Sequence, residues 1–320
     1  MTNIDAELEG KFGDRLKRGE PLAKHVNYRL GGPAEWFIEV KTLEELKWTV
    51  DLMQEYSFPY VILGGGSNTL VSDNGYKGVV IKIGLRNFEI EGNTVAADAG
   101  VISASLARAT ANAGLAGFTW AISLPGTIGG AVRGNAGCFG GEIRDALIHA
   151  TILRDGEIVE LANADLKFGY RDSIIKHNQD TVLQATFKLE KGDAEKLKAE
   201  LAETLASRKD TQPLYAGSAG CIFKNYEVAD QAEMDALNEK LIIPQAMQKA
   251  MRISSGWLIE QMGLKGLEIG GAKISMEHGN FIINNEQATA SDVLAIINHV
   301  KEEAKKRFDI EMEEEVQYIE

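Results

Sequence analysis

Residues 60–68 read YVILGGGSN, a short apolar run that ends abruptly in three glycines. Glycines directly after a strand let several backbone N–H groups point into one concavity, which suits a phosphate group. Ser67 and Asn68 would add side-chain donors at the same place. The alternative interpretation is a tight turn that only ends the strand, because the segment matches neither the dinucleotide-binding motif nor the P-loop.

A second glycine-rich tract follows at residues 123–141 and reads SLPGTIGGAVRGNAGCFGG. Small residues at this density let a chain lie closely against a flat cofactor or a diphosphate. A flexible linker would consist mainly of glycine and serine, whereas these glycines are interleaved with Pro, Ile, Ala, Val and Asn. The tract therefore favours a binding surface over a linker.

Strand and helix patterns alternate around the first tract. A strand at 36–40, a helix at 42–56 and a strand at 60–63 indicate a βαβ unit. Thr42 and Glu45 have capping-box spacing at the start of this helix. The chain around the first glycines is thus expected to be part of a parallel sheet.

The remaining elements are predicted from hydrophobic periodicity and turn residues. They are a strand at 79–83, hairpins at 88–97 and 150–161, helices at 103–113, 193–209, 255–262 and 291–308, and strands at 181–189 and 281–284. Thr289 and Asp292 have capping-box spacing at the last helix. These elements indicate an α+β protein.

The composition limits the function. A length of 320 residues suggests about two or three compact units. With 34 Lys and Arg against 47 Asp and Glu, the net charge is −13, which argues against nucleic-acid binding but not against one local anion site.

The sequence also bears on the compartment. It contains no run of about 18 apolar residues, so it predicts no membrane-spanning helix. Two cysteines, Cys138 and Cys221, can form neither a disulfide framework nor a zinc site, so we expect a cytoplasmic protein without a metal.

The two tracts resemble the flavin-binding segments of the FAD-binding fold shared by vanillyl-alcohol oxidase and p-cresol methylhydroxylase. Further motifs resemble one family, the UDP-N-acetylenolpyruvoylglucosamine reductases (MurB), and follow its order from about residue 20 to the C-terminus. They are NYRLGGPA at 27–34, GYRDS at 169–173, GCIFKN at 220–225, GWLIEQ at 256–261, GLKG at 263–266 and EEEV at 313–316. The short stretch at 179–209 resembles the shorter type of this family, which lacks the substrate-covering tyrosine loop.

The resemblance implies an α+β fold with a two-part FAD-binding region of the p-cresol methylhydroxylase type and a C-terminal α+β substrate domain. Residues 1–85 would form the first FAD-binding subdomain, and residues 310–320 would return to it. Residues 86–205 would form the second subdomain. Residues 206–309 would bind a UDP-sugar.

The resemblance also implies a reaction. NADPH would reduce non-covalently bound FAD, which would pass a hydride to UDP-N-acetylglucosamine enolpyruvate and give UDP-N-acetylmuramate for peptidoglycan synthesis. None of the five histidines lies in the two tracts, so the tracts offer no histidyl attachment point. We expect a UDP-sugar as small-molecule partner, no nucleic-acid or membrane partner, and a monomer in preference to an oligomer.

The resemblance places the binding residues in separate parts of the chain. Its cofactor-binding residues are Gly64, Gly65, Gly66, Ser67, Asn68, Thr69, Ser123, Pro125, Gly126, Thr127, Gly129, Gly130, Asn135, Ala136 and Gly137. Its substrate-binding residues are Lys224, Asn225, Gln261 and His278, with Lys265 as a further candidate. Taken alone, His278 is more often a structural histidine.

The chemistry of this reaction requires particular groups. Hydride addition to an enol ether conjugated to a carboxylate produces an enolate, so a cation must stabilise the charge and an acid must protonate the adjacent carbon. Arg171 and Glu315 match the family's catalytic arginine and glutamate, and Cys221 stands where the family more often has a serine proton donor. Ser218 is a rival donor, although it is three positions out of register.

Each of these residues also has a structural interpretation. Arg171 could form a surface salt bridge, Glu315 could belong to a solvated charge run, and Cys221 could be a small buried side chain.

Two rival functions of the whole protein also stay open. One is another flavoenzyme of this fold that oxidises alcohols or sugars, and the other is a non-catalytic nucleotide-binding protein, which the cysteine at position 221 would favour.

Overall fold

The computed structural model describes residues 3–285 and 287–320 and divides them into two compact units. Unit 1 contains the chain up to Glu20 and residues 33–66 and 76–210. Unit 2 contains residues 21–32, 67–75 and 211–320. The predicted division into three domains stays a prediction.

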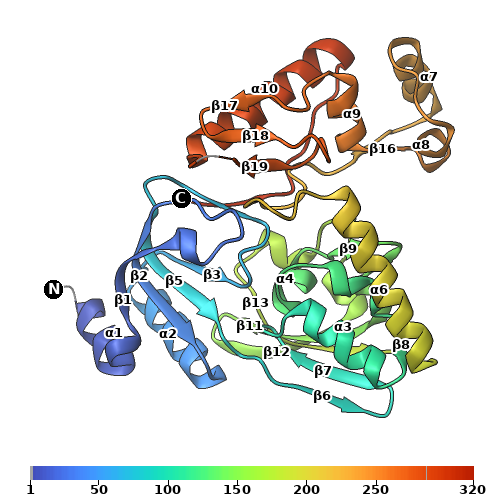
Figure 1. The fold of residues 1–320 in the computed structure, drawn as a ribbon. Coiled ribbons are helices and arrows are strands. Elements are labelled where there is room, and N and C mark those ends of the chain that lie inside the picture. The colour runs from blue at the N-terminus through green and yellow to red at the C-terminus, as the bar shows by residue number, and fades with distance from the viewer. Residues whose placement is uncertain (1–2, 286) are drawn as a thin grey trace. The chain divides into compact units, whose positions relative to one another are not determined.

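Unit 1 begins with helix α1 (Asn3–Phe12) and a four-stranded sheet (Figure 1). The strand order is β1 (Lys17–Pro21), β2 (Pro33–Val40), β5 (Tyr76–Ile83) and β3 (Tyr60–Leu63). Strands β2 and β3 both run parallel to β5, and α2 (Leu43–Glu55) connects them, so the predicted βαβ unit is confirmed. Helix α2 buries Leu46, Val50 and Met53, the apolar positions that its helical spacing brings to one face.

The start of α2 shows how the sequence fixes the helix end. Thr42 is the N-cap, and its Oγ1 accepts a hydrogen bond from the Glu45 N–H at 3.2 Å. The Glu45 carboxylate accepts from the N–H of Lys41 at 2.8 Å and pairs with Arg15 at 2.5 Å. The predicted capping interaction from Thr42 is thus confirmed, while Glu45 bonds one residue further back than a capping box requires.

A second, five-stranded sheet in unit 1 is antiparallel. Its order is β12 (Glu157–Ala162), β11 (Leu147–Arg154), β13 (Thr181–Lys188), β7 (Thr94–Asp98) and β6 (Phe88–Glu91). Both predicted hairpins are confirmed, since β6 pairs with β7 and β11 with β12. The other elements of this part are α3 (Ser103–Asn112), β8 (Leu115–Ala116), α4 (Ile128–Arg133), β9 (Gly137–Cys138), β10 (Gly141–Glu142), α5 (Ile143–Ala146), β14 (Glu190–Lys191) and α6 (Ala194–Thr211).

The short helix α4 lies inside the second glycine-rich tract, where the sequence predicts no helix. It buries Ile128, Ala131 and Val132, which have the i, i+3, i+4 spacing of a helix. Gly129 and Gly130 separate the first of these apolar residues from the other two and obscure the pattern. The tract is therefore ordered structure anchored in the core, not a linker.

Unit 2 is built on a three-stranded antiparallel sheet of β17 (Glu268–Ile269), β18 (Ala272–Ile274) and β19 (Ile282–Asn284). Helix α10 (Ala290–Phe308) packs against β17 and β18 of this sheet, and α9 (Ser255–Gln261) packs against α10 (Figure 1). The predicted capping box at α10 is confirmed, with Thr289 and Asp292 each accepting the other's backbone N–H. The remaining elements are β4 (Thr69–Val71), β15 (Tyr226–Glu227), α7 (Gln231–Lys240), α8 (Gln245–Ala250), β16 (Arg252–Ile253) and β20 (Gln317–Ile319).

Segments far apart in the sequence complete unit 2. Strand β20 near the C-terminus pairs in parallel with β4. Tyr28 is completely buried, and its hydroxyl donates to the carbonyl of Ile282 at 2.8 Å. The motif at 27–34 thus contributes a core side chain that ties an early segment to β19.

Candidate functional site

The two glycine-rich tracts come into contact in unit 1. A Cβ added to Gly65 would lie 2.6 Å from the Cα of Gly126, and one added to Gly64 would lie 2.7 Å from Thr127 Oγ1. Both separations are shorter than side-chain contacts allow, so only glycine permits this approach. The sequence predicted one binding region from both tracts, and the fold brings the end of β3 against the start of α4.

Thr127 carries an unpaired polar atom at this junction. Its Oγ1 is buried and has no hydrogen-bond partner among the described residues, and the same holds for Ser103 Oγ. The Ser103 N–H donates to the carbonyl of Gly126 at 3.1 Å, so both hydroxyls belong to the same junction. A buried hydroxyl without a partner costs free energy, about 1–3 kcal/mol. Phosphate or ribose oxygens are suitable partners, so these residues fit a dinucleotide cofactor.

The predicted cofactor-binding residues are distributed over both units. Unit 1 contains Gly64, Gly65, Gly66, Ser123, Pro125, Gly126, Thr127, Gly129, Gly130, Asn135, Ala136 and Gly137, and unit 2 contains Ser67, Asn68 and Thr69. Within unit 2, the Asn68 side-chain amide donates to the carbonyl of Glu315 at 2.9 Å. Within unit 1, Gly129 packs so closely that an added Cβ would lie 2.8 Å from the Cβ of Ala99.

Asn135 has a structural function that the sequence did not reveal. Its side chain is fully buried and donates to Glu142 Oε2 at 2.8 Å and to the carbonyl of Gly169 at 2.9 Å. Its Oδ1 accepts from the N–H of Arg144 at 3.1 Å. The second glycine tract is thereby joined to the turn that carries Arg171. A direct contact between Asn135 and a cofactor stays a prediction.

Arg171 lies in a tight turn of unit 1 in which Gly169 and Asp172 bond each other's backbone. Its guanidinium carbon lies 5.3 Å from the centre of the Tyr170 ring, a cation–π distance. Both carboxylate oxygens of Asp172 lie 2.9 Å from His177 Nε2, within hydrogen-bond distance. The acid beside Arg171 is therefore paired with His177.

Cys221 and Glu315 lie on neighbouring backbone segments of unit 2. The Glu315 N–H donates to the carbonyl of Ile222 at 2.7 Å, one residue after Cys221. Cys221 itself forms an isolated bridge with Phe281 next to β19. The fold thus brings together two predicted catalytic residues that are 94 positions apart, since 315 − 221 = 94.

Asn280 organises this part of unit 2 and was missed from the sequence. Its Oδ1 accepts from the Phe223 N–H at 2.9 Å, and its Nδ2 donates to the Phe223 carbonyl at 2.8 Å. Its own carbonyl accepts from Ile222 at 2.9 Å. The sequence did not reveal this role, because an asparagine just before a strand usually indicates only a turn. Its partner Phe223 lies 57 positions away, so no local sequence pattern predicts the contact.

His278 is held in one tautomer. Its Nδ1 lies 3.2 Å from the N–H of Asn280, so Nδ1 accepts and the neutral ring carries its proton on Nε2. Burial, with a smaller contribution from the charge of Lys265, lowers the pKa of His278. A Cβ on Gly256 would lie 3.0 Å from the ring, which explains the glycine of the motif at 256–261. His278 is thus a neutral donor near pH 7.

The other predicted substrate-binding residues also lie in unit 2. Lys224 pairs with Glu313 at 2.5 Å. Asn225 Oδ1 accepts from the N–H of Ser255 at 3.1 Å, at the start of α9. Gln261 is the last residue of α9 and is exposed. Lys224, Asn225 and His278 therefore gather around the segments that carry Cys221 and Glu315, whereas Gln261 lies on the helix surface.

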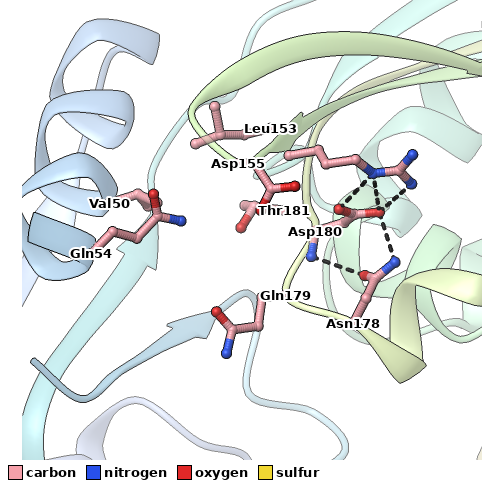
Figure 2. A pocket seen from close by; sticks show the side chains of 9 residues that line it. Val50, Gln54, Leu153, Asp155, Asn178, Gln179, Asp180 and Thr181 are labelled. Atoms are coloured by element: carbon pink, nitrogen blue, oxygen red, sulfur yellow. Dashed lines mark hydrogen bonds and ion pairs between the residues drawn. The ribbon is translucent and has the colours of Figure 1, made fainter. Parts of the chain in front are cut away.

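A separate cavity of about 150 Å³ in unit 1 contains none of the predicted site residues (Figure 2). It is lined by Val50, Gln54, Leu153, Arg154, Asp155, Asn178, Gln179, Asp180 and Thr181. Arg154 is the cation of this lining, and its guanidinium is paired with Asp180 at 2.6 Å. The cavity therefore offers no unpaired positive charge for an anionic ligand.

Two family models match the chain. The model of the UDP-N-acetylenolpyruvoylglucosamine reductase C-terminal domain matches residues 212–319, and that of an FAD binding domain matches residues 34–162. Reductases of that name from Halalkalibacterium halodurans and Bacillus subtilis are 39% and 36% identical, over all of this chain and 99% of each relative. The crystal structure of the reductase from Thermus caldophilus is 32% identical, with a TM-score of 0.75 over 95% of this chain and 98% of that chain.

Proposed function

This chain belongs to the UDP-N-acetylenolpyruvoylglucosamine reductase family, and from that premise we propose which of its residues perform each part of the reaction. The protein is an FAD-dependent oxidoreductase of peptidoglycan synthesis. Bound FAD would supply the redox chemistry of the reaction, the relay of a hydride from NADPH to the enolpyruvyl group of the UDP-sugar. The residues of this chain hold the reactants and manage the charge and the proton.

The junction of the two tracts is proposed to hold the FAD diphosphate. Gly64, Gly65 and Gly126 supply backbone without side chains, and Thr127 supplies a buried hydroxyl that has no protein partner among the described residues. That hydroxyl is the observation that carries the proposal. A phosphate oxygen would accept a hydrogen bond from this hydroxyl and remove the cost of an unpaired polar group.

Arg171 is proposed to stabilise the developing enolate. Hydride addition to one carbon of the double bond moves the electron pair to the neighbouring carbon and into the carboxylate. A guanidinium fork matches the two oxygens of that group and stays charged at all accessible pH values. The Tyr170 ring beside Arg171 supports the cation by its π face.

Cys221 and Glu315 are proposed to complete the reaction. The Cys221 Sγ–H bond breaks as its proton moves to the enolate carbon, and the resulting thiolate is reprotonated from water. The backbone of Glu315 is held next to Cys221 through the Ile222 carbonyl, and its carboxyl group is proposed to assist protonation. Protonation by a positioned acid typically contributes 10²–10⁴-fold, that is, on the order of 3–5 kcal/mol.

The UDP part of the substrate is proposed to bind near the same segments of unit 2. Lys224 contributes a positive charge for the diphosphate, although Glu313 competes for it. Neutral His278 offers its Nε2–H as a donor, and Asn225 offers its amide group, whose Oδ1 already bonds Ser255. Gln261 is the weakest of these assignments because it lies on the exposed end of α9.

We further propose that the protein acts in the cytoplasm as a monomer. The helices of the described residues include none long and apolar enough to span a membrane. Neither Cys138 nor Cys221 forms a disulfide bond, which fits a reducing compartment. Size-exclusion chromatography with light scattering should give one chain of 34.9 kDa, and a stable dimer would contradict this.

NADPH consumption tests the proposed activity. The purified protein should carry a flavin spectrum and should consume NADPH rapidly only when the enolpyruvyl UDP-sugar is present. Equal consumption with oxygen alone would instead identify an oxidase. Flavin without any turnover would support a binding protein.

A further inference from the structure

The backbone of Arg171 adopts a conformation that is rare for arginine. Its φ is 56°, in the left-handed region that glycine favours. Gly169 and Asp172 exchange two backbone hydrogen bonds with N···O distances of 3.0 and 3.3 Å, so Tyr170 and Arg171 are the central residues of the turn. A non-glycine residue stays in such a conformation only where its surroundings hold it.

Three side chains hold this turn in place. Asn135 donates to the carbonyl of Gly169 at 2.9 Å, and Ser173 Oγ donates to a carbonyl of α4 at 2.6 Å. These two bonds fix the ends of the turn against the second glycine tract. Lys176 acts on the strained residue itself, since its Nζ donates to the carbonyl of Arg171 at 2.7 Å.

The hydrogen bond from Lys176 to the carbonyl of Arg171 is charge-assisted. An ammonium donates a charge-assisted hydrogen bond, which is shorter and stronger than a bond between neutral groups. Lys176 is partly buried, which limits competition from water. It lies in the 3₁₀ turn Ile174–His177 that follows Ser173, so its own backbone is fixed relative to the turn.

We propose that Lys176 is a positioning residue that holds the left-handed backbone of Arg171 and thereby fixes where the guanidinium lies when the enolate forms. This inference rests on the role proposed above for Arg171. A change of φ from positive to negative rotates the Cα–Cβ bond, so a relaxed turn would direct the arginine side chain elsewhere. Lys176 would then affect the reaction with the UDP-sugar without touching either reactant.

The test separates the two half-reactions by stopped-flow spectroscopy of the flavin-loaded enzyme. Lys176→Met removes the ammonium and keeps an unbranched apolar side chain of about the length of the lysine's four methylenes. Reoxidation by the enolpyruvyl UDP-sugar should slow by about tenfold or more, while reduction by NADPH should change by less than about twofold. Lys176→Arg keeps a cationic donor and should restore reoxidation to within about threefold of the native rate.

Two further variants serve as controls. One loosens the same turn without changing Lys176, and the other removes a lysine elsewhere in the chain. Ser173→Ala loosens the same turn at a different bond and should produce the same selective loss of reoxidation. Lys196→Met removes an exposed lysine on α6 and should leave both half-reactions unchanged. The flavin spectrum of each variant shows whether the fold and the cofactor site are intact.

The double variant Lys176→Met/Arg171→Ala gives the sharpest result. If Lys176 acts through Arg171, the double variant should reoxidise no more slowly than Arg171→Ala alone. A native reoxidation rate in Lys176→Met, beside a slow Arg171→Ala, would refute the positioning role and leave the function of Arg171 intact. A further loss in the double variant would also refute it. If Arg171→Ala itself reoxidised at the native rate, the proposed function of Arg171 would fail and the role of Lys176 with it.

Discussion

At the scale of single residues, the proposed proton donor is the thiol of Cys221, at a position where the resemblance led us to expect a serine hydroxyl. Cys221→Ala should retain reduction by NADPH and slow the protonation step by about 10²-fold or more, because the positioned acid is lost. Cys221→Ser should keep substantial activity. Activity of the native enzyme should fall at alkaline pH as a thiol is converted to thiolate, whereas the serine variant should not show this loss.

Alkylation provides a second measurement on the same thiol. Substrate should protect Cys221 from a thiol reagent, and the experiment needs a Cys138→Ala background because Cys138 is also a free thiol. Burial raises the pKa of Cys138, so that thiol should react slowly even without the substitution. Native turnover in Cys221→Ala would make the thiol a packing residue and leave Ser218 or water as the donor.

His278 should make the stability of the protein depend on pH. Its pKa is lowered in the folded state by burial and by Lys265, so below about pH 6.5 the unfolded chain binds a proton that the folded chain does not. The free energy of unfolding should therefore fall as the pH falls from about 6.5 through the lower folded-state pKa. His278→Asn keeps an acceptor for the Asn280 N–H and removes the titration.

Urea unfolding at pH 7.5 and at pH 5 measures this effect. The native protein should lose more of its free energy of unfolding between the two pH values than His278→Asn. Equal losses would show that His278 does not couple protonation to folding.

At the scale of elements, one glycine-to-alanine substitution in each tract separates the packing of the two tracts from contact with the cofactor. A Cβ on Gly130 of α4 would have 3.9 Å to its nearest protein atom, Thr127 Oγ1, whereas one on Gly65 would lie 2.6 Å from Gly126 Cα. Gly65→Ala should destabilise the fold by about 1–3 kcal/mol through overpacking and also weaken FAD binding. Gly130→Ala should stay fully stable, so any loss of FAD in it reports contact with the cofactor.

Flavin occupancy and thermal unfolding measure the two effects separately. A Gly130→Ala protein with full flavin occupancy would show that this glycine does not touch the cofactor. A Gly65→Ala protein as stable as the native one would show that the tracts do not need their close contact.

The elements that the sequence predicted well are those whose pattern is local. The capped helices α2 and α10, the hairpin turns at 92–93 and 155–156, and the parallel βαβ unit follow from periodicity and turn residues within about 30 positions. Helix α4 was missed because two of its six residues are glycines. Helices α1 and α7 were missed because charged and polar residues cover most of their surface.

At the scale of the whole molecule, the sequence predicted the family, whereas it did not predict the residues that hold the candidate site in place. The order of six motifs predicted the family, which is confirmed, and it pointed to Cys221, Arg171 and Glu315 as catalytic residues, which stays a prediction. Asn280 and Lys176 have no motif of their own, because their effect depends on backbone groups that only the fold brings near. The contact between Gly65 and Gly126 is likewise set by tertiary structure, 61 positions apart, since 126 − 65 = 61.

The central claim is that Arg171 and Glu315 serve the reaction with the UDP-sugar and not the reaction with NADPH. The most direct measurement is stopped-flow spectroscopy of Arg171→Ala and Glu315→Gln, each loaded with FAD. We predict reduction by NADPH within about twofold of the native rate and reoxidation by the enolpyruvyl UDP-sugar slower by about 10²-fold or more. Equal slowing of both half-reactions, or native reoxidation in either variant, would contradict the account.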